Sequence, residues 1–258
     1  MALCKTEKEI EYMREAGRIV ALAHKAVQKE MKPGISTKYL NKIVENVIIS
    51  HGASPSFKGL YGFPAAACIS VNSVLVHGIP DDTILKDGDV VSVDIGACIH
   101  GYHGDSAWTY GVGAISEEVQ ELMDVTRQSL FEGLKQAKAG NRLTDISHAI
   151  GEYVFSHGFS VARDFSGHGI GTSVHEDPSV PNFGPSGKGA LLKEGMTFAV
   201  EPMVLMGKPH VKTLHDGWSI VAKDGRPTAH FEHTIVITRD GYEILTTLTD
   251  KEDCQKNG

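Results

Sequence analysis

Cysteine is scarce in this chain, and no long apolar run is present. The four cysteines, Cys4, Cys68, Cys98 and Cys254, show neither the paired spacing of a zinc finger nor the density of a secreted disulfide scaffold, so we expect reduced thiols. Charged residues interrupt the N-terminus where a signal peptide needs an apolar stretch, and no segment approaches the length of a membrane span. The sequence therefore predicts a cytoplasmic protein with no membrane partner.

Positive charge is also in deficit. Lysine and arginine number 25 against 32 aspartates and glutamates, which gives a formal net charge of −7. This balance offers no support for a direct nucleic-acid function that works through bulk electrostatics, although a local basic patch is compatible with it. With 258 residues and 41% hydrophobic content, we expect a single globular domain over residues 1–258, built as one core or two closely packed halves.

Helix and strand signals are mixed along the chain. Thr6 and Glu9 have capping-box spacing and precede apolar residues at helical intervals, so we expect a helix that ends at Pro33-Gly34. Ser116 has the character of another helix cap, and a shorter helix should begin near Thr144. Further expected elements are a helix over 37–49 and strands over 67–71, 90–97, 197–204, 219–222 and 230–238. This mixture predicts an α/β or α+β fold.

Two echoes indicate an internal repeat. Lys32-Pro33-Gly34 and Ser50-His51-Gly52 recur 106 positions later as Lys138-Ala139-Gly140 and Ser156-His157-Gly158. Leu85-Lys86-Asp87-Gly88 before Asp94 recurs 107 positions later as Leu192-Lys193-Glu194-Gly195 before Glu201. Chance is the alternative for either echo alone, but two in the same order favour a duplication. We therefore expect halves of roughly 6–110 and 114–245 that face each other about a pseudo-twofold axis, with Asp94 and Glu201 equivalent.

A β-hairpin is expected between Asp94 and Asp105, where a turn-rich segment separates two strand-like runs. We place its tip at Ile99-His100, which sets Asp94 directly opposite Asp105. Two facing carboxylates repel each other, and aspartate is disfavoured in strands, so the pair needs a shared proton or a cation.

Two further acids belong to strand-like runs in the second half: Glu201 ends one run, and Glu232 lies inside the run over 230–237. Four carboxylates that converge on one centre would be balanced in charge by two divalent cations. His168, between flanking glycines, is the candidate nitrogen ligand, although an ordinary loop histidine remains an equal alternative for it. A solvated surface carboxylate is the alternative for each acid. An oxygen-rich site with one nitrogen suits Mn²⁺, Fe²⁺ or Co²⁺ at least as well as Zn²⁺.

At this point the chain resembles the type I methionine aminopeptidases over nearly its whole length. The resemblance is carried by Cys68-Ile69-Ser70-Val71-Asn72, Val76-His77-Gly78-Ile79-Pro80, Val93-Asp94-Ile95-Gly96, Gly101-Tyr102-His103-Gly104-Asp105, Gly167-His168-Gly169-Ile170-Gly171, His175-Glu176-Asp177-Pro178, Val200-Glu201-Pro202 and Phe231-Glu232-His233-Thr234. It implies the pita-bread fold, in which two related halves share a central curved antiparallel sheet covered by helices. It also implies removal of the N-terminal methionine from nascent proteins and peptides that have a small second residue.

The resemblance gives each metal ligand a role. Asp94 would chelate one ion, and Asp105 and Glu232 would bridge both ions. His168 and Glu201 would complete the second ion's ligands, and Glu201 would also shuttle a proton. A bridging water, its pKa lowered by the ions, would attack the first peptide carbonyl while the ions stabilise the oxyanion.

Two more histidines match family positions that contact the scissile peptide without binding metal. His77 would lie near its nitrogen and His175 near its carbonyl oxygen. Without the motif, an ordinary loop histidine would be the favoured interpretation of both.

Methionine selection needs an apolar pocket that accepts a flexible thioether. Family positions imply a substrate pocket of Phe57, Leu60, Phe63, Cys68, Val174 and Trp218. Simple core packing is the alternative for Phe57 and Leu60. Leu60 and Val174 stand where the family commonly has aromatic residues, which leaves the pocket shape open.

Other functions stay open on the same scaffold. A proline-specific aminopeptidase or dipeptidase would use the same five ligands, but those relatives usually carry a large N-terminal domain, for which the helix start at Thr6 leaves no room. The type II methionine enzyme usually has a helical insertion in a region where only 31 positions separate Glu201 from Glu232. A non-catalytic binding protein would tend to lose ligands. We expect a monomer, and Lys208 with Lys212 suggests a basic loop that approaches the ribosome.

Overall fold

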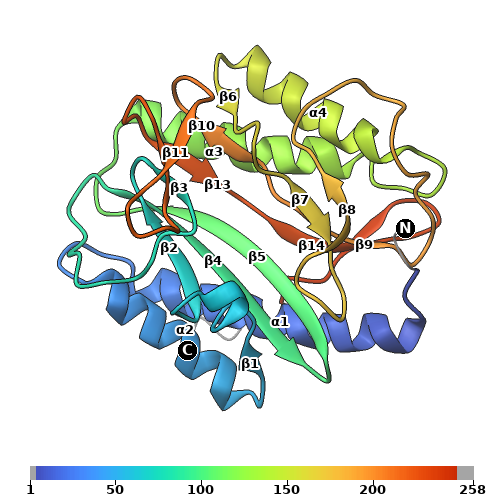
Figure 1. Cartoon of the computed structure of the whole chain (residues 1–258), viewed down its shortest axis with the longest axis horizontal. Coiled ribbons are helices and arrows are strands. Elements are labelled where there is room, and N and C mark those ends of the chain that lie inside the picture. The colour runs from blue at the N-terminus through green and yellow to red at the C-terminus, as the bar shows by residue number, and fades with distance from the viewer. Residues whose placement is uncertain (1–3, 249–258) are drawn as a thin grey trace, which may run out of the picture.

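The α-helices of residues 4–248 form two pairs, and in the view of Figure 1 the strands lie between the pairs. The structure is a computed structural model that describes residues 4–248, so the expectation for Cys254 lies outside the described residues. Cys4, Cys68 and Cys98 are free thiols, as expected. Within residues 4–248, none of the helices has both the length and the apolar character that crossing a membrane requires. The helices are α1 (Glu7–Glu30), α2 (Thr37–Ser50), α3 (Glu117–Leu134), α4 (Leu143–Ser156) and the 3₁₀ turn η1 (Leu60–Gly62).

All strand pairing in the described residues is antiparallel, in four small sheets. The strands of the first half are β1 (Ser54–Pro55), β2 (Ala67–Val71), β3 (Val74–Val76), β4 (Val90–Ile99) and β5 (Tyr102–Gly111). Those of the second half are β6 (Ser160–Val161), β7 (Gly167–Gly169), β8 (Glu176–Val180), β9 (Thr197–Val200), β10 (Met203–Leu205), β11 (Val211–Thr213), β12 (Ile220–Ala222), β13 (Thr228–His230), β14 (His233–Ile237) and β15 (Tyr242–Ile244). The longest strands, β4 and β5, form the hairpin expected around Asp94 and Asp105.

The helix starts follow the local signals. The Thr6 hydroxyl accepts from the amide of Glu9, and the Glu9 carboxylate accepts from the amide of Thr6 at 2.6 Å, so the capping box at α1 is confirmed. The Ser116 hydroxyl caps α3 by accepting from the amide of Val119 at 3.3 Å. The helix expected near Thr144 begins at Leu143. Each cap satisfies an amide that the helix itself cannot pair.

The predicted register of the β4–β5 hairpin was wrong by two residues. Asp94 pairs with Ala107, and Asp105 pairs with Gly96, because the turn lies at His100-Gly101. Both turn residues have positive φ, 54° and 79°, which is typical of the tight hairpin turn that matches strand twist. A shift of two residues keeps each side chain on the same face, so the two carboxylates are diagonal neighbours on one side of the hairpin.

The two long strands predicted for the second half are each interrupted. The 197–204 run divides into β9 and β10 around Glu201-Pro202, because proline has no amide hydrogen to continue a ladder. The 230–238 run divides into β13 and β14 around Phe231-Glu232. The two acids of the second half therefore lie at breaks in strands rather than inside them.

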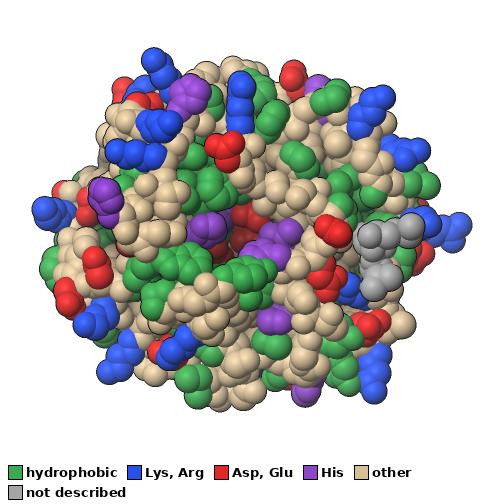
Figure 2. Space-filling view, viewed as in Figure 1, with side chains coloured by type: hydrophobic (Ala, Val, Ile, Leu, Met, Phe, Trp, Pro, Cys, Tyr) green, Lys and Arg blue, Asp and Glu red, His purple; other side chains and the backbone are tan. Residues whose placement is uncertain are grey.

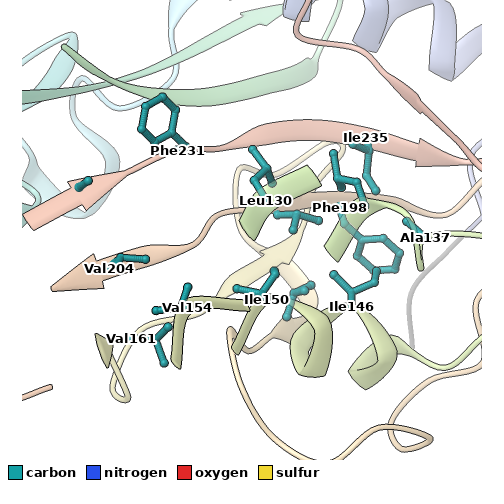
Figure 3. Close-up of a cluster of buried hydrophobic side chains, with 14 of the residues drawn as sticks. Leu130, Ala137, Ile146, Ile150, Val154, Val161, Phe198, Val204, Phe231 and Ile235 are labelled. Atoms are coloured by element: carbon teal, nitrogen blue, oxygen red, sulfur yellow. The ribbon is translucent and has the colours of Figure 1, made fainter. Parts of the chain in front are cut away.

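Each helix pair covers the strands of its own half and forms a separate core. In the first half, α1 and α2 pack on β2 and β4 through fully buried residues such as Leu40 and Ile95. In the second half, α3 and α4 pack around Phe198, which is fully buried between Ile146 and Ile235 in the view of Figure 3. Burial of these apolar side chains is the main stabilising contribution in both halves.

Corresponding hydrogen bonds occur in the two halves at the spacing of the sequence echoes. The matched bonds are Gly34 N to Leu85 O (2.8 Å) with Gly140 N to Leu192 O (3.0 Å), and His51 Nδ1 to Val47 O (2.8 Å) with His157 Nδ1 to Tyr153 O (2.8 Å). They show why the Lys-x-Gly and Ser-His-Gly motifs recur, since each motif makes the same turn. They support the expected repeat, while the single catalytic domain over 1–258 stays a prediction.

Candidate metal centre

A cavity of about 700 Å³ opens on the face shown in Figure 2, with acidic side chains at its bottom and histidines around them. All five predicted ligands line it, as do both predicted substrate histidines. The cavity-lining residues predicted from the sequence are Phe57, Leu60, Phe63, Cys68, His77, Asp94, Asp105, His168, His175, Glu201, Trp218 and Glu232. The structure thus brings together residues that lie between Phe57 and Glu232 in the sequence.

Hydroxyl groups join the two halves at the cavity floor. The Thr234 hydroxyl donates to the carbonyl of Asp105 at 2.8 Å and accepts from the amide of Asp105 at 3.0 Å. The Ser106 hydroxyl donates to the carbonyl of Glu232, whose own amide donates to the carbonyl of Ala107 at 2.8 Å. These contacts fix β5 against the start of β14 and place Asp105 beside Glu232.

Two overlapping groups of side chains have the spacing of metal ligands. Ligand atoms of Asp105, His168 and Glu232 lie within 4.8 Å of one another, and so do those of Glu201, His230 and Glu232. Glu232 belongs to both groups, which suits a ligand shared between two ions. Asp94 joins neither group at that spacing, although it lines the same cavity.

The carboxylate oxygens at the cavity floor lack hydrogen-bond partners within residues 4–248. These oxygens are Asp94 Oδ1, Asp105 Oδ1 and Glu232 Oε1, and the last two side chains are only 4% and 2% exposed. An unpaired buried anion is strongly disfavoured unless a cation or proton balances it. Several oxygen donors with imidazole nitrogens are the chemistry that divalent transition metals accept. The residues therefore fit a divalent metal site.

Without a cation, these acids hold their protons more tightly than ordinary carboxyls. Burial raises the pKa of Asp94 to about 6, against the opposing effect of His230. Burial also raises the pKa of Glu201 to about 7. For Asp105 and Glu232, burial and then repulsion from neighbouring carboxylates hold the pKa well above the usual range. A bound cation reverses this effect, since it favours the ionised carboxylates.

His77 and His175 lie on the cavity wall outside the carboxylate cluster. His175 is stacked on Tyr61, with ring centroids 5.9 Å apart, and meets His168 edge to face at 4.6 Å. His77 has a positive φ of 59°, a conformation that non-glycine residues seldom adopt, and its ring meets Phe165 at 5.9 Å. Burial lowers the pKa of His77 to about 4, so its imidazole is neutral near pH 7.

An apolar pocket adjoins the carboxylates on one side of the cavity. Phe57, Phe63, Cys68 and Val174 form a buried cluster against which Leu60 and Trp218 pack. Phe57 and Leu60 both line the cavity, so core packing alone does not describe them. Val174 is 3% exposed and supports the wall from behind rather than lining the cavity.

Sequence reasoning missed His230, Tyr61 and Phe165, which also line the cavity. His230 is fully buried, and its Nε2 lies 3.3 Å from a carboxylate oxygen of Glu201, although the angle does not make a hydrogen bond. The sequence could have indicated His230 as a site residue, because it lies two positions before Glu232 in an apolar run where a histidine is unusual. Tyr61 gave no comparable signal, because its contact with His175 joins distant loops.

Comparisons with known proteins agree with this geometry. Residues 11–239 match the model of metallopeptidase family M24. Methionine aminopeptidase 1 of Bacillus subtilis is 56% identical over 248 residues, which cover 96% of this chain and 100% of that protein. The crystal structure of methionine aminopeptidase from Thermotoga maritima has a TM-score of 0.95 at 46% identity, covering 96% of this chain and 100% of that one.

A more distant structure, prolidase from Pyrococcus furiosus, has a TM-score of 0.79 at 25% identity. This chain covers 66% of the prolidase chain, whereas it covers the whole of the two methionine aminopeptidases. The pita-bread fold expected from the sequence is confirmed by these structural matches. The chain therefore belongs to metallopeptidase family M24 and, within that family, to the type I methionine aminopeptidases.

Proposed function

We propose that this protein is a metal-dependent aminopeptidase that removes the N-terminal methionine from peptides and nascent proteins. The observation that carries the proposal is the buried group of unpartnered carboxylates beside an apolar pocket in one cavity. The full-length similarity to methionine aminopeptidases supports the same activity.

The proposed ligands for two divalent ions are Asp94, Asp105, His168, Glu201 and Glu232. Asp105 and Glu232 are assigned to both ions, because they lie nearest the junction of the two halves and are the most deeply buried acids of the five ligands. Four carboxylates balance the charge of two divalent ions. Bound there, the ions supply Lewis-acid chemistry that polarises a carbonyl and lowers the pKa of water.

The chain's own groups then bind the substrate and move the proton. Glu201 is assigned the proton transfer, because its carboxylate lines the same cavity as the other four proposed ligands, where it can reach the attacking water. Neutral His77 is assigned to the scissile nitrogen and His175 to the carbonyl oxygen. The pocket of Phe57, Phe63 and Cys68 is assigned to the methionine side chain.

Peptide hydrolysis tests this function directly. Protein stripped with a chelator and reloaded with Mn²⁺, Fe²⁺, Co²⁺ or Zn²⁺ should release free methionine from Met-Ala-Ser and leave Xaa-Pro peptides intact. Cleavage of the Xaa-Pro peptides instead would favour a proline-specific enzyme, and no cleavage with any of the four ions would favour a non-catalytic binding protein. Elemental analysis of the active form should find two ions per chain.

As part of the same proposal, the protein is a cytoplasmic monomer. It prefers substrates with a small second residue and approaches the ribosome. Lys208 lies three residues before β11, and Lys212 lies within it. β11 is an exposed strand that pairs with β12, and β12 begins two residues after Trp218. Reversing both charges should reduce co-sedimentation with ribosomes, and unchanged co-sedimentation would count against the contact.

A further inference from the structure

The wall of the cavity between β7 and β8 is an irregular turn, residues 170–175, that carries His175. One carboxylate organises this turn. Glu176 Oε1 accepts from the amides of Thr172, at 2.8 Å, and Ser173, at 3.3 Å, and from the Thr172 hydroxyl at 3.4 Å. The turn therefore depends on the Glu176 side chain remaining in place as a hydrogen-bond acceptor.

Lys5, close to the N-terminus, balances the charge of the Glu176 carboxylate. Its Nζ lies 2.7 Å from Glu176 Oε2, and the two side chains are only 7% and 20% exposed. The amide of Lys5 donates to the carbonyl of Gly195 at 2.7 Å, which fixes the N-terminal segment beside β9. The ion pair thus joins residues that are 171 positions apart.

The lysine side chain also packs against the turn itself. A Cβ at Gly171 would lie 2.3 Å from Lys5 Cε, so a larger residue at 171 would displace the lysine. The carbonyl of Gly171 accepts from the amide of His103 at 2.8 Å, which ties the turn to β5 as well. Burial acts to raise the pKa of Glu176, but the bonds from Lys5 and the turn amides outweigh it and keep the pKa below its usual range.

We propose that Lys5 is a positioning residue: it holds the Glu176 carboxylate that shapes the 170–175 turn, and so fixes the imidazole of His175 against the substrate carbonyl. This inference rests on the proposed aminopeptidase function. Lys5 lines a separate, smaller cavity with Cys4 and Glu9, and it does not line the cavity of the metal centre. Its effect must therefore pass through Glu176 and the turn.

The test compares Lys5→Met with Lys8→Met in the full-length Mn²⁺-loaded protein. Lys8 is exposed in the first turn of α1, three positions after Lys5, so it controls for loss of one N-terminal charge. Lys5→Met should lower kcat for Met-Ala-Ser by about 10-fold to 100-fold, the scale expected when a substrate-contacting group is displaced by about 1 Å. KM and bound metal per chain should stay close to wild type, and Lys8→Met should match wild type in all three.

Hydrogen exchange gives a readout that does not depend on activity. In Lys5→Met the amides of Thr172 and Ser173 should exchange faster than in wild type, while amides of α3 should not change. The double variant Lys5→Met/Glu176→Gln should recover part of the lost kcat, because it removes the charge that Lys5→Met leaves unbalanced. A purely structural role would instead lower the melting temperature and the metal content together, with no such recovery.

Wild-type kcat in Lys5→Met, or equal losses in Lys5→Met and Lys8→Met, would overturn the positioning role. Loss of kcat with unchanged exchange at Thr172 and Ser173 would overturn it too, since the effect would not pass through the turn. If the wild-type protein itself releases no methionine, the proposed function fails, and the exchange experiment shows independently whether Lys5 orders the turn.

Discussion

The two halves supply their acids to the cavity in different ways. Asp94 and Asp105 project from an unbroken hairpin, whose ladder fixes both positions through local pairing. Glu201 and Glu232 lie at strand breaks, where distant groups hold the backbone: Asn182 Nδ2 donates to the carbonyl of Glu201 at 2.9 Å, and the amide of Glu232 donates across to β5. The second half thus depends on long-range contacts for positions that the first half fixes mainly through the ladder of its hairpin.

The largest expected effect concerns the acids that meet where the halves join. Asp105→Asn and Glu232→Gln should each lower kcat/KM by on the order of 10³-fold, because each removes a charge shared by two ions and metal binding contributes several kcal/mol. Steady-state kinetics with elemental analysis measures both losses. Turnover retained in either variant would refute the shared-ligand assignment, and a loss in only one would show that the halves contribute unequally.

Truncating a large side chain in each core tests whether the two halves unfold together. Phe198→Ala in the second half should lower the free energy of unfolding by about 3–5 kcal/mol and Leu40→Ala in the first half by about 2–5 kcal/mol, since both residues are fully buried. Urea unfolding followed by circular dichroism checks this. A single transition in both variants indicates one cooperative unit, whereas two transitions in either would separate the halves.

A buried histidine in the first half makes stability depend on pH. His24 Nε2 must donate to the carbonyl of Ser106 at 2.9 Å, so Nδ1, which lies 2.9 Å from the Tyr110 hydroxyl, is the unprotonated nitrogen. Burial lowers its pKa from 6.5 to about 4. Between these values the unfolded chain binds a proton that the folded chain does not. The stabilisation is therefore complete above pH 6.5 and declines as the pH falls towards 4, by at most about 3 kcal/mol.

Chemical unfolding at several pH values tests this dependence with two variants. His24→Gln keeps a donor and an acceptor but does not titrate, so its free energy of unfolding should change less between pH 7 and 4.5 than that of wild type. His210→Gln, at an exposed position, should follow the wild-type curve. Identical pH dependence in all three proteins would show that His24 does not cause the decline.

The smallest expected effect is at the hydroxyl that joins the halves. Thr234→Val keeps the shape of the residue but leaves the amide and carbonyl of Asp105 without their partner, which should lower the free energy of unfolding by about 1–3 kcal/mol. Thr213→Val, on an exposed strand, is the matched control. A thermal shift no larger than that of the control would mean that Thr234 adds nothing to the junction.

The sequence predicted the helix starts and strands that depend on neighbouring residues. Thr6 and Ser116 predicted the starts of their helices, because a cap acts within one helical turn. The bounds of β2 were predicted correctly from its apolar run. The hairpin register failed because the positive φ of His100, which sets the turn, has no reliable sequence signal. The error did not harm the site prediction, since Asp94 and Asp105 kept the same face.

Distant contacts could not be predicted in this way. The five ligands were chosen from acid spacing and a resemblance, and the structure places all five in one cavity. His230 was missed because its partner Glu201 lies 29 positions away, across a strand break. The pairing of Lys5 with Glu176 spans 171 positions, and no sequence pattern near either residue predicts the contact.

The hydroxyl contacts between β5 and β14 have a consequence for how the molecule tolerates change. The hydroxyls of Thr234, Ser106 and Thr109 connect β5 to the segment 230–234 at a few points, whereas a continuous ladder would pair the two backbones along their whole length. Residues away from these contacts can therefore change within either half while the cavity floor keeps its geometry.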